Sequence, residues 1–414
     1  MNLLQLSWKN LMYKPLSTTL SVVLFALGVG LISLLFLLNK QLEENFERNL
    51  AKIDLVIGAK GSPLQLILNS MYHIDAPTGN ISLKEARPFL NAKHPLISRA
   101  IPLSMGDNYR GYRILGTTQD IVDLYNAEIS EGEIWEKNFD VTIGAAVAQQ
   151  LDLKLGDTFF SSHGFADDED LVHDGGDPFE VVGILAPSGT VVDQLILTTT
   201  QTFWLVHAHE EEDHAGHSSH KVVPKPLMEE DDEEEITSLL VQFKGRNFQA
   251  LNMGRNINEN TDMQAATPAI EVNRLFSLVN TGEQALRALA VIIIIVSAFS
   301  IFISLFSSLK DRQYELALMR VMGGKPSQLF VLVILEGLLL AILGYVIGIL
   351  LSHGGMALFA GEIQEAYRYN FSAWTFLKEE LYLLIGALVI GFLAAVIPAV
   401  QASRTDISET LAKA

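Results

Sequence analysis

The stretch that decides the fold reads Ala288-Leu-Ala-Val-Ile-Ile-Ile-Ile-Val-Ser-Ala-Phe-Ser-Ile-Phe-Ile-Ser-Leu-Phe-Ser-Ser-Leu309. It contains no charged residue. Because an α-helix rises about 1.5 Å per residue, a run of this length crosses the roughly 30 Å hydrocarbon core of a bilayer. Three further runs, 17–38, 329–351 and 381–402, have a similar length and apolar character. The sequence therefore predicts a membrane protein with four transmembrane helices.

Basic residues in the short connecting segments predict the orientation. Lys9 and Lys14 precede the first run, and Lys310, Arg312, Arg320 and Lys325 lie between the second and third. Short segments rich in Lys and Arg stay in the cytoplasm. The predicted cytoplasmic parts are an amphipathic lead-in over 1–16, a coupling segment over 310–328 and a tail over 403–414. The predicted parts on the opposite side are a large domain over 39–287 and a loop over 352–380.

The domain predicted between the first two runs carries most of the acidic residues. Residues 40–286 hold 39 of the 48 Asp and Glu residues but only 18 of the 29 Lys and Arg residues. Such acidity excludes a nucleic-acid partner, which requires a cationic surface. Short β-like runs such as 179–185 and 238–244 alternate with helical patterns such as 82–91, which indicates an α+β domain. The chain has no cysteine, so disulfides and thiol chemistry are excluded as well.

An acidic, histidine-rich tract interrupts the domain at residues 207–235. It is too polar to bury a core, and we expect it to be a mobile insertion. Seven consecutive acidic residues occupy 229–235, and the tract holds five histidines: His207, His209, His214, His217 and His220. Imidazole and carboxylate groups are ligands for Zn²⁺, so the tract is a candidate metal site. A solvated linker would have the same composition, and the irregular histidine spacing leaves both interpretations open.

The segment between the second and third runs predicts a short amphipathic helix over 312–322. Tyr314, Leu318 and Val321 or Met322 share one face at helical spacing, while the charged side chains lie elsewhere. A glycine pair then ends the helix. An ordinary basic turn between membrane helices is the simpler alternative, but a turn has no need of an apolar stripe. The residues expected to contact a partner are Arg312, Tyr314, Glu315, Leu318, Met319, Arg320, Gly323 and Gly324.

Glu336 lies about two turns inside the third run. A carboxylate there is costly unless it has a polar partner. It could serve as a proton or substrate site, but a structural pairing near the cytoplasmic end is the preferred interpretation.

Four separated motifs resemble the MacB/FtsX-like family of ABC transporter permeases, and together they extend over nearly the whole chain. They are Ser7-Trp-Lys-Asn-Leu11, Leu153-Lys-Leu-Gly-Asp157, Asp311-Arg-Gln-Tyr-Glu-Leu-Ala-Leu-Met-Arg-Val-Met-Gly-Gly324 and Ile397-Pro-Ala-Val-Gln-Ala-Ser-Arg404. The resemblance implies a permease homodimer or heterodimer in a bacterial inner membrane, with its large domain in the periplasm. It also implies a cytoplasmic ABC ATPase dimer as partner, whose ATP-driven closure moves the periplasmic domain for substrate export, extraction or hand-off.

The chain itself is expected to be non-catalytic. It has no G-x-x-x-x-G-K-[ST] phosphate loop, so ATP is expected to bind to the partner subunit, and no cofactor is expected on the chain other than Zn²⁺ at the histidine tract. The run 54–73 resembles a branch of the family associated with zinc supply. Two other functions remain open: a mechanical switch that activates a periplasmic enzyme, and a metal-sensing membrane protein. The switch would require a periplasmic protein partner, and the sensor would require a bound metal ion.

Overall fold

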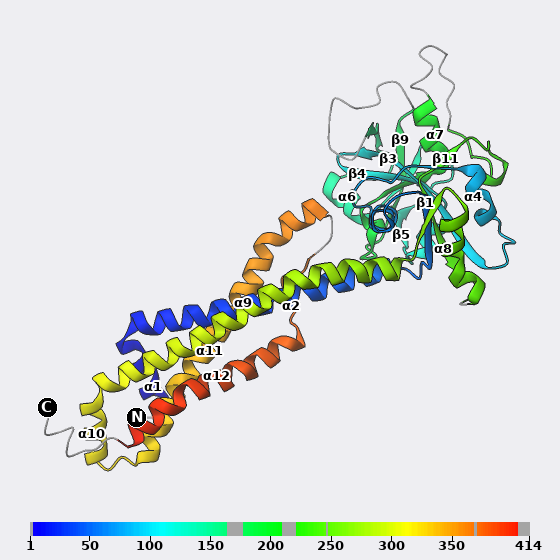
Figure 1. Ribbon diagram of the computed structural model, residues 1–414. Coiled ribbons are helices and arrows are strands. Elements are labelled where there is room, and N and C mark those ends of the chain that lie inside the picture. The colour runs from blue at the N-terminus through cyan, green and yellow to red at the C-terminus, as the bar shows by residue number, and fades with distance from the viewer. Residues whose placement is uncertain (1–2, 164–176, 209–220, 246, 368–370, 405–414) are drawn as a thin grey trace. The chain divides into compact units, whose positions relative to one another are not determined.

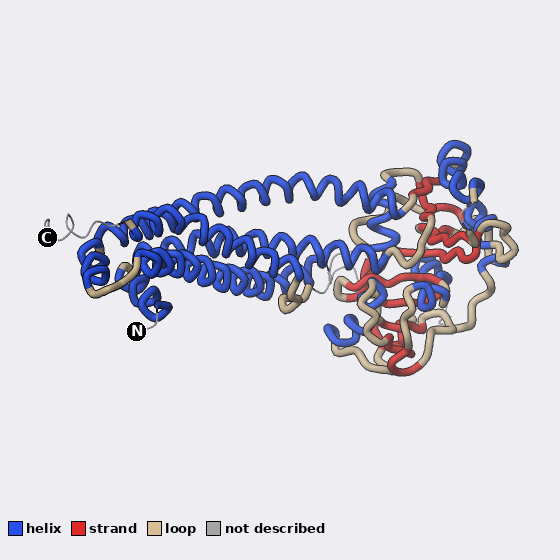
Figure 2. The backbone as a smooth tube through the Cα atoms, turned by 90° about the horizontal axis from the view of Figure 1, so that it is seen from below, coloured by secondary structure: helices blue, strands red, loops and turns tan. Residues whose placement is uncertain are grey.

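A computed structural model describes residues 3–163, 177–208, 221–245, 247–367 and 371–404 (Figure 1). The chain forms two compact units. One unit comprises Met1–Leu42, Leu278–Ala366 and Asn370–Ala414, and the other comprises Glu43–Ser277 with Tyr367–Tyr369. The first is helical, and the second contains the strands, drawn red in Figure 2.

Four long helices build the helical unit: α2 (Pro15–Asn49), α9 (Pro268–Asp311), α11 (Pro326–Tyr367) and α12 (Lys378–Ser403). Each is long and apolar enough to cross a membrane. The mixed α+β unit lies between α2 and α9 in the chain, so the predicted fold class, four transmembrane helices with an inserted α+β domain, is confirmed. Two short helices, α1 (Leu3–Tyr13) and α10 (Gln313–Val321), complete the described part of this unit.

Three of the long helices extend beyond the apolar runs that predict them. α2 continues to Asn49, and α9 begins at Pro268, so the ends of both helices belong to the second unit. α11 continues to Tyr367 because no proline follows the apolar run to stop it. Much of the expected loop 352–380 is therefore helical.

Glycines allow the long helices to approach closely. A Cβ atom added to Gly337 of α11 would lie 2.8 Å from the carbonyl oxygen of Gly391 in α12. A Cβ on Gly30 of α2 would lie 2.9 Å from the carbonyl oxygen of Gly348 in α11. Small residues favour such close packing in membranes, because the surrounding lipid provides no hydrophobic driving force for helices to associate. A cluster of buried apolar side chains, the first of them Leu11 and the last Ala402 in the sequence, forms the core around these contacts.

A mixed sheet forms the centre of the second unit. Its main path runs in the order β13-β1-β12-β3-β4-β10-β6-β9-β5, with β7 beside β9 and β8 beside β3. The β4–β10 and β6–β9 pairs are parallel, whereas the other pairs are antiparallel. The strands are β1 (Leu55–Ala59), β3 (Ile97–Tyr109), β4 (Tyr112–Thr117), β5 (Ile129–Gly132), β6 (Asp140–Ile143), β7 (Thr158–Phe159), β8 (Ser162–His163), β9 (Phe179–Leu185), β10 (Ile196–Thr199), β12 (Ser238–Phe243) and β13 (Met263–Ala266).

Local sequence signals start the helices that cover this sheet. The Ser62 hydroxyl accepts a hydrogen bond from the Gln65 amide at the start of α3, and Asn247 does the same for Ala250 at the start of α8. Alternation in β9 buries Phe179, Val181 and Leu185. The helices are α3 (Pro63–Tyr72), α4 (Leu83–Leu90), α5 (Asp120–Leu124), α6 (Ala145–Leu151), α7 (Thr200–Ala208) and α8 (Phe248–Asn260), with 3₁₀ turns η2 (Val191–Gln194) and η3 (Leu227–Glu229).

The second half of the expected mobile insertion is held to the domain. Lys221 forms ion pairs with Asp140 and Glu180, and Arg87 pairs with Asp232. β11 (Glu235–Ile236) pairs with β2 (Ile81–Ser82). Residues 221–235 are thus anchored by charge pairs and strand pairing, whereas 209–220 lie outside the described residues.

Candidate functional site

The predicted amphipathic helix forms as α10, from Gln313 to Val321. Its end is set by the glycine pair. Gly323 has φ +99°, a conformation that L side chains rarely adopt, and a Cβ on Gly324 would lie 2.8 Å from the Met319 carbonyl oxygen. The chain therefore turns sharply here before α11 begins at Pro326.

α10 has one buried face and one exposed apolar face. Leu316 and Ala317 are buried in the helical unit. On the opposite side four apolar side chains are largely exposed: Tyr314 51%, Leu318 43%, Val321 57% and Met322 73%. We call these four residues the apolar stripe. Glu315 is exposed beside it, and Met319 is half-buried against the core.

Arg312 does not lie on the exposed face. Its side chain is almost fully buried, and its Nη2 lies 3.1 Å from Oε1 of Glu336 on α11. The Asn10 amide of α1 donates to the same carboxylate oxygen at 2.7 Å. Glu336 therefore has the structural pairing that we preferred over a transport role, and Arg312 ties the start of α10 to α11.

Other polar contacts fix α10 and α1 to the long helices. Arg320 Nη1 donates to the Ser403 carbonyl oxygen at the end of α12 at 3.2 Å. The Ser7 hydroxyl donates to the Leu332 carbonyl oxygen at 3.2 Å, and Lys14 forms an ion pair with Asp311 at the end of α9. α10 is therefore tied to α11 and α12, and α1 is tied to α11.

A second group of contacts binds the ends of α2 and α9 within the α+β unit. The Phe46 ring of α2 lies 4.6 Å from the Tyr72 ring of α3 and 5.4 Å from the Phe276 ring of α9, measured between centroids. Tyr72 also donates its hydroxyl to the Phe46 carbonyl oxygen at 3.2 Å. Burial raises the pKa of Tyr72, and Tyr125 contributes to the same rise, so this hydroxyl stays protonated as a donor.

Asn49, at the end of α2, makes the polar part of this joint. Its side chain is 1% exposed, its Oδ1 accepts from the Val191 amide at 2.9 Å, and its Nδ2 donates to the Asn45 carbonyl oxygen at 2.8 Å. The loop that contains Val191 is closed by Asp193, whose carboxylate accepts from Ser188 and Gly189. We call the contacts of Phe46, Asn49, Tyr72, Val191 and Phe276 the helix joint. Sequence patterns did not reveal it, because its members come from four separate segments.

The predicted metal site falls mostly outside the described residues. His207 lies in α7, whereas His209, His214, His217 and His220 are not described. Across the described ranges, no three His, Asp or Glu side chains gather in a metal-binding arrangement. The prediction of metal binding therefore stays a prediction.

Comparison with known families finds two adjoining matches. Residues 18–270 match the MacB-like periplasmic core domain, and residues 287–407 match the FtsX-like permease C-terminal domain. The first match spans α2 and nearly all of the α+β unit, and the second spans most of α9 with α10, α11 and α12. A search of curated proteins finds no match.

Proposed function

The chain belongs to the MacB/FtsX-like family of ABC transporter permeases, and we propose that it couples ATP hydrolysis by a separate cytoplasmic ATPase to movement of its α+β domain. The family implies an ABC ATPase as partner. The observation that carries the proposal is the apolar stripe of α10, exposed on a helix whose other face is buried.

The stripe fits insertion into a groove of the ATPase. Full burial of one large apolar side chain contributes about 1.5–3 kcal/mol to association. A helix that places several such residues on one face is a common form of groove recognition. Glu315 beside the stripe supplies a charge that can set the register.

The base of α10 suits the transfer of force. The Arg312–Glu336 ion pair and the Arg320–Ser403 hydrogen bond tie both halves of α10 to long helices. Movement of the ATPase against the stripe is therefore passed to α11 and α12 and not absorbed by a flexible loop.

Two helices connect the apolar region to the domain without a break. α2 runs from Pro15 to Asn49 and α9 from Pro268 to Asp311, and both enter the helix joint. We infer that the domain lies in the periplasm of a bacterium and moves with these helix ends. The functional permease is a homodimer or heterodimer, and its task is export, extraction or hand-off of a substrate.

The decisive experiment measures ATP hydrolysis by the cognate ATPase reconstituted with the full chain in lipid nanodiscs. Leu318→Asp places a charge in the centre of the stripe and should abolish both co-purification and permease-stimulated hydrolysis. Gln313→Glu adds the same charge on an exposed position of α10 outside the stripe and should leave both unchanged. Full stimulation with Leu318→Asp refutes the docking role.

A further inference from the structure

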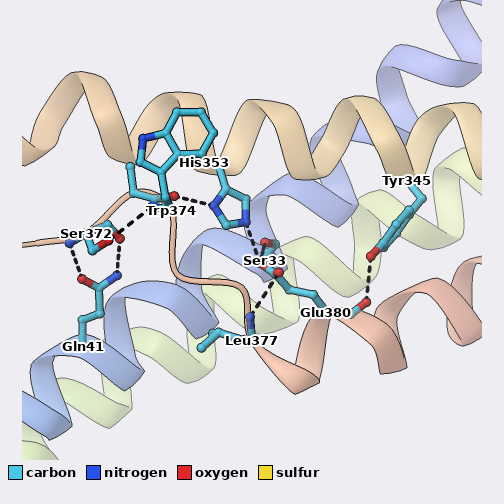
Figure 3. A network of polar contacts seen from close by, with 9 residues as sticks. Ser33, Gln41, Tyr345, His353, Ser372, Trp374, Leu377 and Glu380 are labelled. Carbon is cyan, nitrogen blue, oxygen red and sulfur yellow. Dashed lines mark hydrogen bonds and ion pairs between the residues drawn. The ribbon is translucent and has the colours of Figure 1, made fainter.

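A buried polar cluster lies in the helical unit, among α2, α11, α12 and the loop 371–377 (Figure 3). At its centre are His353 of α11 and Glu380 of α12, with relative exposures of 4% and 3%. Ser33 of α2 donates a hydrogen bond to Glu380 and is fully buried. This cluster is remote in sequence from α10 and plays no part in the proposed docking.

Both ring nitrogens of His353 face hydrogen-bond acceptors. Nδ1 lies 2.5 Å from the carbonyl oxygen of Ala373, which can only accept, so Nδ1 carries a proton. Nε2 lies 3.0 Å from Oε1 of Glu380. A neutral imidazole has only one N–H, so the contact between Nε2 and Glu380 needs a second proton.

Two other groups donate hydrogen bonds to the Glu380 carboxylate. The Ser33 hydroxyl donates to Oε1 at 2.9 Å, and the Leu377 amide donates to Oε2 at 3.3 Å. Both donors suit an ionised carboxylate, which accepts at each oxygen. The cluster is therefore satisfied when it holds this second proton, either as an imidazolium and a carboxylate or as a neutral imidazole and a carboxylic acid, and both pairs have no net charge.

Loss of the second proton would break this arrangement. The Nε2 lone pair would then face the lone pairs of Oε1, and an uncompensated negative charge would remain buried, which is strongly unfavourable. Movement of the loop that carries Ala373 away from His353 would let water reach the pair and hydrate the exposed charge.

Other polar groups lie around the pair among the side chains that the structure describes. The Tyr345 hydroxyl of α11 donates to the Glu380 carbonyl oxygen at 3.1 Å, and Gln41 of α2, which has no charge, exchanges two hydrogen bonds with the Ser372 backbone. Lys378 and Glu379 of α12 are exposed. Lys40 of α2 is exposed as well.

We propose that His353 and Glu380 form a proton-binding site that holds the loop 371–377 closed against α2 and α11. With the proton bound, the backbone of Ala373 is fixed, and the Phe376 ring of the same loop lies 4.6 Å from the His353 ring, measured between centroids. Release of the proton opens the loop. The transporter thereby acquires a dependence on the pH of the compartment that this loop faces, in addition to its dependence on ATP.

The absence of cysteine in the chain allows a direct test by thiol labelling. Ala373→Cys places a thiol at a buried position of the loop, and Thr375→Cys places one at an exposed position two residues away. Each full-length variant, in lipid nanodiscs, is reacted with a membrane-impermeant maleimide between about pH 6 and about pH 9. The ratio of the two labelling rates removes the ordinary effect of pH on thiol reactivity.

We expect this ratio to rise with pH by up to about tenfold per pH unit, the limit for an opening that releases one proton. His353→Gln and Glu380→Gln in the Ala373→Cys chain should each make the ratio independent of pH. A flat ratio in the chain with His353 and Glu380 intact overturns the proposal, and this measurement needs no variant of the pair to fold. An equal rise in His353→Gln overturns it as well.

Discussion

Nη2 of Arg312 lies 3.1 Å from Oε1 of Glu336, and both side chains are buried. The pair joins the first turn of α10 to α11 across 24 residues of chain. Arg312 belongs to a segment that sequence patterns assign to partner contact, yet its partner is within the same chain. The pair ties the start of α10 to α11.

Removal of one member of this pair should cost more than removal of both. Arg312→Ala leaves the Glu336 carboxylate buried and unpaired, a loss of about 3–5 kcal/mol. Arg312→Met combined with Glu336→Leu removes both charges and should recover most of that stability. Thermal unfolding of the full chain in detergent measures the effect. Equal stability of Arg312→Ala and the native chain contradicts a structural ion pair.

The helix joint should respond to loss of a single hydrogen bond. Asn49→Ala leaves the Val191 amide buried without its acceptor, at a cost of about 1–3 kcal/mol. Hydrogen exchange should become faster over 188–194, because this loop is held between Asn49 and the Asp193 carboxylate. Asn260→Ala is the matched control, since Asn260 is exposed and its side chain donates to Asn256 within its own helix. Unchanged exchange in Asn49→Ala argues against the joint.

Acid should weaken the domain around His73. Burial, together with the nearby Arg113 guanidinium, lowers the pKa of His73 to about 3. In the unfolded chain the pKa of this histidine is about 6.5. Between the two pKa values the unfolded chain binds more protons than the folded chain, so the stability of the fold decreases as the pH is lowered.

His73→Asn removes this titration and keeps the left-handed conformation at the end of α3, where φ is 53°. Hydrogen exchange of the α3 amides, followed from neutral to acidic pH, should show a shallower loss of protection in the variant. Identical pH profiles exclude His73 as the source.

The histidine tract predicts reversible Zn²⁺ binding. Deletion of residues 209–220 removes four of its five histidines, and it should abolish zinc binding measured by calorimetry on the full chain. Replacement of 209–220 by a Gly/Ser segment of equal length controls for loop length and should behave like the deletion. Binding that survives both changes places the metal elsewhere.

The exposed face of α10 could be predicted from the sequence because it depends only on the spacing of apolar residues along one short segment. Residues four apart in a helix share a face, and the glycine pair marks its end, so the bounds 312–322 differ from α10 by one residue at each end. The exposure of Leu318 and Met322 follows the same periodicity. Nothing local distinguishes Arg312 from the other basic residues of the segment, because its burial depends on where Glu336 lies in space.

The cluster around His353 shows the same limit more clearly. The sequence places His353 just after an apolar run and Glu380 just before the next, and the loop predicted over 352–380 contains both. Continuation of α11 beyond that run carries His353 into contact with the start of α12. The two ring nitrogens of His353 face acceptors on two different segments, the Ala373 carbonyl oxygen in the loop and the Glu380 carboxylate on α12.

By itself, the sequence determined the four long apolar helices, the inserted α+β domain and the apolar stripe. Each of these follows from composition or periodicity along a continuous stretch, since transfer of apolar side chains from water and helical spacing are local properties. Only the tertiary structure decided the partners of Arg312, Asn49 and His353. Pairing of buried polar groups depends on which distant segments meet, and helix and sheet packing settles that by satisfying every desolvated donor and acceptor together.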